Sequence, residues 1–265
     1  MKKLTAIISL VALCFGAKAQ ESISIPLSEP SQPANVHFAI VTGSIQVLGY
    51  AGKEVIVTVE DSPVQAYKPV QREDGLKKIN ARQGFEIRAE EDHNTVRIVS
   101  SRPNQKMSIK VQVPVNANLK ISTVNNGNVN VEHVSGSIEA RNVNGSINMK
   151  EISGTVTANT VNGNVNVSFS KIENSPMAFT TVNGDIAVSL PANANVDVKV
   201  KSERGDIYSD FDIKLDETPQ KVVISNEEGI KKITKDGYTV GSINNGGPEL
   251  FMKNLNGKIV IRKNK

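Results

Sequence analysis

Residues 142–167 read NVNGSINMKEISGTVTANTVNGNVNV, and in this stretch a glycine returns every nine residues. The period extends over Thr123–Val167, which divides into five units of the form x-x-[VI]-[NS]-G-x-[VI]-x-[VAM], except that Asn125 fills the first apolar position of the first unit. Two apolar residues at alternate positions after each glycine place their side chains on one face of a short strand. The Asn-Gly or Ser-Gly pair before them supplies a turn, because Asn and Gly adopt positive φ at low cost. The five turn glycines are Gly127, Gly136, Gly145, Gly154 and Gly163.

A finer alternation sets the number of units in one coil. The residue before glycine alternates between Asn and Ser, so like residues recur every eighteen positions. The residue four places after glycine has the same beat, with Val131, Met149 and Val167 in odd units and Ala140 and Ala158 in even ones. We therefore predict two strands per coil in opposite sheets, with identical residues stacked at roughly 4.8 Å. Large and small side chains would share a thin core, and stacked Asn would donate amide hydrogen bonds from coil to coil.

The flanking sequence places this repeat within a longer all-β chain. The odd glycine column is expected to continue at Gly184 and Gly205, in steps of twenty-one residues, whereas the later Gly241 and Gly257 fit the frame less well. Regular solenoid is expected over 114–210. A β-rich N-terminal cap at 20–113, with a polar loop at 61–84, and a β-rich C-terminal cap at 211–265 would cover its ends. The prediction is an elongated β-solenoid with about 18 to 21 residues per coil.

The first nineteen residues have the order of a secretory signal: a lysine pair, an apolar run from Leu4 to Gly16, and small residues before Gln20. Residues 1–19 are expected to be cleaved. The apolar run is too short to span a bilayer, so no transmembrane segment is expected. Export would place the protein in the periplasm, on the outer-membrane surface or outside the cell. Cys14 is the only cysteine, so the mature chain would have no disulfide, thiolate metal site or cysteine nucleophile.

The net charge gives little support for a nucleic-acid partner. The formal charge of +4 comes from 31 basic and 27 acidic residues. Lys2, Lys3 and Lys18 precede the expected cleavage site, which leaves 28 minus 27, or +1, in the mature chain. Nucleic-acid binding depends on a basic excess that neutralises phosphates, so no nucleic-acid partner is expected.

Several stretches resemble a known bacterial family. They include SGSIEARNVNGSINMKEISGTVTANTVNGNVNV, the earlier TGSIQVLGYAGKEVIV, and the later GSINNGGPELFMKNLNGKIVIRK. These resemble the β-strand-repeat family of putative adhesins, exported domains of unknown function found mostly in Bacteroidetes-type bacteria. The resemblance implies a β-solenoid of the cell envelope with no catalytic residues to transfer. The family often has Asp after the turn glycine, but here only Asp185 and Asp206 keep it.

The residues offer few candidates for metal binding or catalysis. A calcium ladder needs a carboxylate in each turn, whereas most turns here have amides and hydroxyls. A polysaccharide-cleaving β-helix needs clustered acids on one face, and Thr123–Phe169 contains only Glu132, Glu139 and Glu151. The three histidines, His37, His93 and His133, have no ligand-like spacing. No catalytic, cofactor-binding or metal-binding residue is predicted, and no cofactor.

Two short motifs are better explained by the repeat than by a function. Arg204-Gly205-Asp206 matches an integrin-binding tripeptide, but the repeat already requires Gly205, and Asp206 corresponds to Asp185. Asn144-Gly145-Ser146 matches a glycosylation acceptor, but it lies in a tight turn of a bacterial protein.

The sequence favours a non-enzymatic cell-envelope protein, a putative adhesin or envelope interaction scaffold. Its partner would be an unidentified envelope or cell-surface protein or glycan, and the sequence sets no oligomeric state. Binding would be sought in loops that interrupt the repeat, at 61–84, 170–180 and 226–238. Two alternatives stay open: a carbohydrate-active β-helix enzyme, and a periplasmic sensing module that binds a membrane partner.

Overall fold

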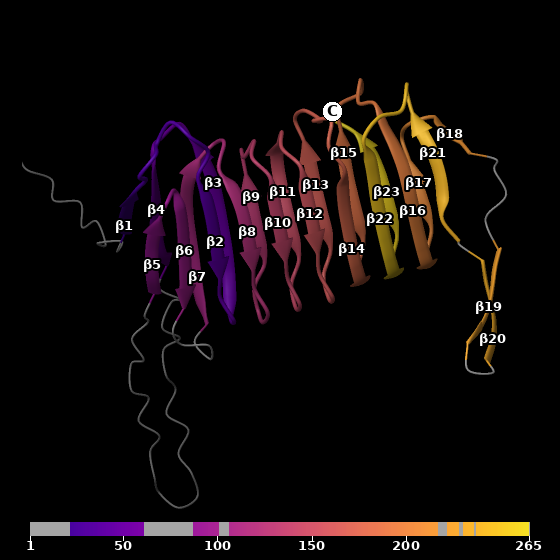
Figure 1. Cartoon of the computed structure of the whole chain (residues 1–265), viewed down its shortest axis with the longest axis horizontal. Coiled ribbons are helices and arrows are strands. Elements are labelled where there is room, and N and C mark those ends of the chain that lie inside the picture. The colour runs from indigo at the N-terminus through magenta and orange to yellow at the C-terminus, as the bar shows by residue number, and fades with distance from the viewer. Residues whose placement is uncertain are drawn as a thin grey trace, which may run out of the picture.

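The computed structural model describes residues 22–60, 87–100, 106–216, 222–227, 230–235 and 237–264. All regular structure in these residues is β-strand, arranged as two long sheets whose strands lie side by side along the long axis of the molecule (Figure 1). None of the described residues forms a helix long and apolar enough to cross a membrane. The predicted signal at 1–19 and the predicted loop at 61–84 lie outside the described residues.

The two sheets are named A and B. Sheet A has, in spatial order, β1 (Ser22–Pro26), β4 (Glu54–Glu60), β7 (Met107–Pro114), β3 (Gly43–Tyr50), β9 (Val129–Glu132), β11 (Ile147–Ile152), β13 (Val165–Phe169), β15 (Ile186–Leu190), β23 (Ile259–Lys263) and β17 (Ile207–Ser209). Sheet B has β18 (Ile213–Leu215), β21 (Thr239–Ile243), β16 (Val196–Arg204), β22 (Glu249–Asn256), β14 (Met177–Asn183), β12 (Val156–Asn159), β10 (Ile138–Arg141), β8 (Asn118–Ser122), β2 (Asn35–Ala39), β6 (Thr95–Ser100) and β5 (Ile87–Asp92). A separate hairpin pairs β19 (Val222–Glu227) with β20 (Ile230–Lys235).

The central part of the chain winds once around the two sheets per coil, here called a rung. Each rung has one strand of sheet B followed by one of sheet A, from β8 and β9 to β14 and β15. Neighbouring rungs pair in parallel, and Ile147 lies between Val129 and Val165, eighteen residues away on either side. The predicted β-solenoid with two strands per coil is confirmed.

The turn glycines stack as predicted, and the backbones of neighbouring rungs approach too closely there for a side chain. A Cβ atom on Gly145 would lie 2.0 Å from the carbonyl oxygen of Gly127. On Gly163 it would lie 2.2 Å from the carbonyl oxygen of Gly145. Contact between rungs therefore requires glycine at these positions, although neither Gly145 nor Gly163 has a positive φ.

The core is a thin apolar layer between the two sheets. Alternate residues of each central strand are buried, so their side chains point inward and the intervening polar ones point outward. Met149 in sheet A and Ala140 and Ala158 in sheet B are all buried, which accommodates the alternation of large and small residues. Towards the C-terminal end the rings of Phe169 and Phe179 pack edge to face, with centroids 6.3 Å apart.

The order of the rungs differs from the order of the sequence near the C-terminal end. The rung of β22 and β23 lies between the rung of β14 and β15 and that of β16 and β17. Gly257 therefore stacks on Gly184, and Gly205 stacks on Gly257 rather than directly on Gly184. The segment expected to cap this end supplies an internal rung, because it has the same strand, Asn-Gly turn and strand as the repeat.

The N-terminal end has a similar rearrangement. The rung of β2 and β3 lies between that of β6 and β7 and that of β8 and β9. Antiparallel strands complete the ends: β4 pairs with β7, and β5 with β6, whereas β21 pairs with β16 at the other end. Such strands change the direction of the edge that a further parallel rung would meet.

Candidate interaction surfaces

The edge of the solenoid at the turn glycines has a ladder of asparagine side chains. Each amide nitrogen donates to the amide oxygen of the neighbouring rung, at 2.7 to 3.0 Å. The members, in spatial order, are Asn125, Asn144, Asn162, Asn183 and Asn256. The three middle residues both donate and accept, so the ladder primarily joins one rung to the next.

A second, more buried column binds the carbonyl groups of the turn glycines. The hydroxyls of Thr160 and Thr181 each donate to the carbonyl of the glycine one rung back, at 2.9 Å. In the inserted rung Asn254 takes this place, and its amide nitrogen donates to Gly184 at 3.1 Å. The Oδ1 atom of Asn254 is buried without a hydrogen-bond partner, which is an unfavourable feature for a polar atom.

The column directly after the turn glycines is also bonded between rungs. The backbone N–H of Asp185 donates to Asn164, and the Asp185 carboxylate accepts from the backbone N–H of Lys258, both at 2.9 Å. The inserted rung places Lys258 between Asp185 and Asp206 along this column. The Lys258 Nζ lies 3.8 Å from Asp185. A cation here would face an ammonium group, and the described residues contain no group of three potential metal-ligating side chains.

The acids considered for catalysis do not lie together. Glu132 ends a strand of sheet A, whereas Glu139 lies on sheet B, where Arg141 and Lys120 are 2.7 and 3.8 Å away. Glu151 has φ of 54° at an irregularity in β11 and is exposed. Carboxyl groups on opposite faces of the solenoid cannot flank one glycosidic bond.

The three histidines are also apart. His37 lies on sheet B between Arg97 and Lys120, and its pKa is lowered by burial, then by these two cations. His93 lies in the β5–β6 turn, and His133 has φ of 59° after β9. Their positions on separate elements offer no shared metal site.

The Arg204-Gly205-Asp206 tripeptide is exposed at the end of β16. Gly205 stacks on Gly257, as the repeat requires. The carboxylate of Asp206 accepts a hydrogen bond from the Tyr208 hydroxyl at 3.2 Å. The residues therefore follow the geometry of the ladder.

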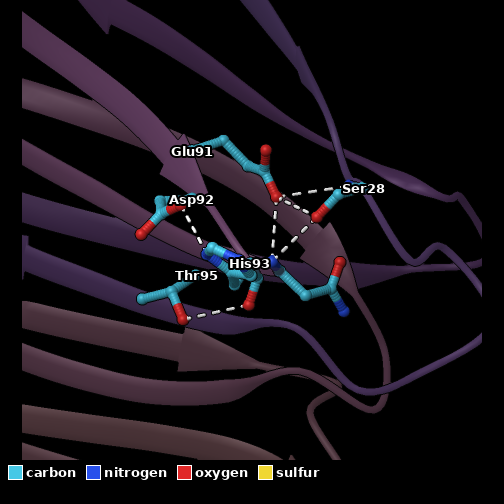
Figure 2. A network of polar contacts seen from close by, with 6 residues as sticks. Ser28, Glu91, Asp92, His93 and Thr95 are labelled. Carbon is cyan, nitrogen blue, oxygen red and sulfur yellow. Dashed lines mark hydrogen bonds and ion pairs between the residues drawn. The ribbon is translucent and has the colours of Figure 1, made fainter.

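The N-terminal end has a compact polar network (Figure 2). One carboxylate oxygen of Glu91 accepts from the hydroxyl and backbone N–H of Ser28, at 2.6 and 3.2 Å, and from the backbone N–H of Asn94 at 2.9 Å. The Ser28 hydroxyl is the main cause that lowers the pKa of Glu91. His93 and Asn94 both have positive φ, as a two-residue hairpin turn requires. The network fastens the segment after β1 to this turn, which is a structural role.

The outer face of sheet A has a shallow hollow of about 440 Å³. Its floor includes Asn130, Asn148 and Asn166, whose amides form a second ladder at 3.0 and 2.9 Å. Ser168 and Ser189 continue the lining. The lining also includes Glu132 and Lys150, so the surface offers amides and hydroxyls together with one charge of each sign.

A second cleft, of about 480 Å³, lies where the inserted rung interrupts the order of the sequence. Three connections line it, from residues 170–174, 191–195 and 246–248. The connection at 191–195 joins β15 to β16 across the inserted rung. One of the three predicted binding regions, 170–180, therefore begins in this cleft and continues into β14. Another, 226–238, includes strand β20 and the last two residues of β19 rather than being a loop throughout.

A search of curated proteins finds no significant match. The crystal structure of a putative cell adhesion protein from Clostridium sporogenes ATCC 15579 is 13% identical, with a TM-score of 0.43, over 92% of this chain and 100% of that one. A putative adhesin from Bacteroides fragilis NCTC 9343 is 10% identical, with a TM-score of 0.36, over 94% and 98%.

The family resemblance expected from the repeat is confirmed by the family comparison. The model described as Toastrack DUF4097 matches residues 37–242, which is more than half of the chain. The match includes every central rung and extends into β21. The protein therefore belongs to the toastrack family, DUF4097.

Proposed function

We propose that this protein is a non-catalytic interaction scaffold of the bacterial cell envelope. The observation that supports the proposal most directly is that the polar side chains of the repeat form hydrogen bonds between rungs. The side chains of the amide ladders and of the glycine-binding column donate hydrogen bonds to the neighbouring rung. This favours a rigid spacer over a reaction centre. Structural similarity to proteins described as putative adhesins is consistent with an adhesive role.

Contact with a partner is expected at the loops that connect the rungs rather than on the ladder, which continues through the inserted rung. The cleft between residues 170–174, 191–195 and 246–248 offers backbone groups and the side chains of Asn174, Asn193 and Asn195. Loops can vary in sequence without disturbing the hydrogen bonds of a ladder, so they suit recognition better than the repeat does.

Protease shaving of intact cells tests the envelope location. Protease added to whole cells is expected to remove the protein while a periplasmic marker stays intact. Cells that lack the gene are then expected to lose attachment to host cells or to neighbouring bacteria. Survival of the protein next to an intact marker would contradict surface exposure. Co-purification with a membrane protein would then favour the periplasmic sensing alternative.

A further inference from the structure

The outer face of sheet B has a concentration of positive charge that the nearly neutral chain does not suggest. Two adjacent rows of side chains cross the strands from β6 to β16 at the levels of Lys199 and Lys201, as the strand register shows. Together they contain one acid, Glu139, and six basic residues. The basic residues, here called the basic track, are Arg97, Lys120, Arg141, Lys199, Lys201 and Lys253.

The C-terminal end of the basic track combines cations with aromatic rings. The rings of Tyr238 and Phe251 lie 5.7 Å apart, and the Nζ atoms of Lys199 and Lys201 lie 5.1 and 5.6 Å from the centre of the Tyr238 ring. Lys201 also forms an ion pair with Glu203, 2.8 Å away, whereas Lys253 pairs with Lys201 in the register and is exposed. This end offers both charge and a partly apolar surface.

The N-terminal end of the basic track has three cations and one acid, Glu139, and a second acid, Glu90 of β5, lies opposite Arg97 in the register. Glu139 lies 2.7 Å from Arg141 and 3.8 Å from Lys120, so one carboxylate is shared by two cations. His37 lies between Lys120 and Arg97 in the sheet. Its pKa is lowered, after the effect of burial, by these two cations, which is consistent with a locally positive field.

The middle of the two rows is uncharged. Thr157, Asn159, Ala178 and Thr180 lie between the two charged ends. Hydroxyls and an amide at these positions can bond polar groups of a ligand. Seven strand spacings separate β6 from β16, so the basic track is roughly 34 Å long at about 4.8 Å per spacing. Its length suits an extended polymer better than a small molecule.

We propose that the basic track binds a linear acidic polysaccharide. Carboxylates of the polymer would pair with the lysines and arginines, its hydroxyls with the central Thr and Asn, and the apolar faces of its sugars with Phe251. A lipid surface is the competing occupant, because a row of exposed aliphatic side chains flanks the basic track, at Val41, Val143, Val161, Val182 and Leu255. Competition with anionic vesicles distinguishes the two. The inference rests on the proposed binding role but not on where the protein lies in the envelope.

Binding of polygalacturonate to the purified protein tests this inference, with the fully methyl-esterified polymer as the uncharged control. The double variant Arg141→Gln/Lys253→Gln removes two exposed cations from the basic track. The matched variant Lys150→Gln/Arg262→Gln removes two exposed cations from the outer face of sheet A, so both have the same net charge. We expect the first variant to bind polygalacturonate about fivefold more weakly and the second to bind like the wild type.

Three results would overturn the inference. They are no binding of polygalacturonate, equal binding of the esterified polymer, and equal weakening by both double variants. Vesicles rich in anionic lipid and single-stranded DNA serve as competing polyanions, and preference for either over polygalacturonate would also reject it. Failure of the shaving test alone would reject surface exposure and leave this binding result unaffected.

Discussion

The central rungs and the inserted rung of β22 and β23 obey the same backbone rules but differ in their side chains. In both, glycine stacks on glycine and the amide ladder continues, with Asn256 donating to Asn183 at 2.7 Å. Only the inserted rung has an amide oxygen buried without a partner, at Asn254. The close approach of the backbones therefore requires glycine, whereas the side-chain columns tolerate different residues. A rung can be built from a distant segment if its turn and strand pattern fit.

The largest expected effect comes from deleting residues 249–264, which removes an internal rung. β14 and β15 would lose their neighbours on one side, and β16 would lose its parallel partner. We expect the C-terminal quarter, from about residue 196, to become sensitive to limited proteolysis, which mass spectrometry of the fragments would detect.

A matched control replaces the hairpin at 222–235 with a glycine-serine linker of equal length. β19 and β20 pair only with each other among the described strands, so the ladder should keep its protease resistance. Equal sensitivity of both variants would mean that the inserted rung has no special part in stability.

Gly145→Ala tests the strict backbone approach in a central rung. The new Cβ would lie 2.0 Å from the Gly127 carbonyl oxygen, so the rungs must separate. We expect the free energy of unfolding to fall by about 3 kcal/mol in denaturant titrations. Gly237→Ala is the control, because its Cβ would meet only the flexible end of Lys201 at 3.3 Å. A similar loss in both variants would contradict the stacking argument.

The amide ladder predicts a smaller effect with a clear order. Asn162 donates to Asn144 and accepts from Asn183, so Asn162→Ala removes two hydrogen bonds. We expect it to lower the free energy of unfolding by about 1.5 kcal/mol. Asn256→Ala removes one bond to Asn183 and should cost about half as much. The reverse order in thermal or denaturant unfolding would show that the ladder bonds are not the main contribution.

The smallest expected effect is an increase in stability, from a substitution that makes the inserted rung more similar to the central rungs. Asn254→Thr introduces the residue that binds the glycine carbonyl at positions 160 and 181. It keeps one donor and removes the unpaired oxygen, so we expect stability to rise by about 0.5 to 1 kcal/mol. A lower unfolding midpoint for this variant would mean that the cavity left by the shorter side chain outweighs the unpaired oxygen.

The repeat predicts the local structure well because its periods correspond to structural units, with one strand per nine residues and one rung per eighteen. The glycine every nine residues and the alternation of Asn and Ser before it predicted two sheets, stacked coils and the amide ladder. All three are present in the structure. The order of the rungs could not be predicted in this way. The strand edges next to Gly184 accept any rung with a suitable turn, so the sequence pattern does not distinguish Gly257 from Gly205 as its neighbour.

The candidate surfaces were harder to predict from the sequence. Residues 170–174 were predicted as part of a binding region, but their partners at 191–195 and 246–248 come together only through the inserted rung. The basic track joins Arg97 to Lys253 across a sheet whose strand order no local pattern encodes. A net charge near neutrality conceals such a distribution, because it sums over all faces of the molecule.

The inserted rung also affects the order in which the protein can assemble during synthesis. β16 and β17 are made well before β22 and β23, yet they bond to the ladder through them. The earlier layers can close one after another as they emerge, while this pair must wait, with its edges open, for the later segment. If translation stopped before β22, the edge of β14 and β15 would lack its native neighbour. Because that edge accepts any rung with a suitable turn, β16 and β17 could dock on it out of order.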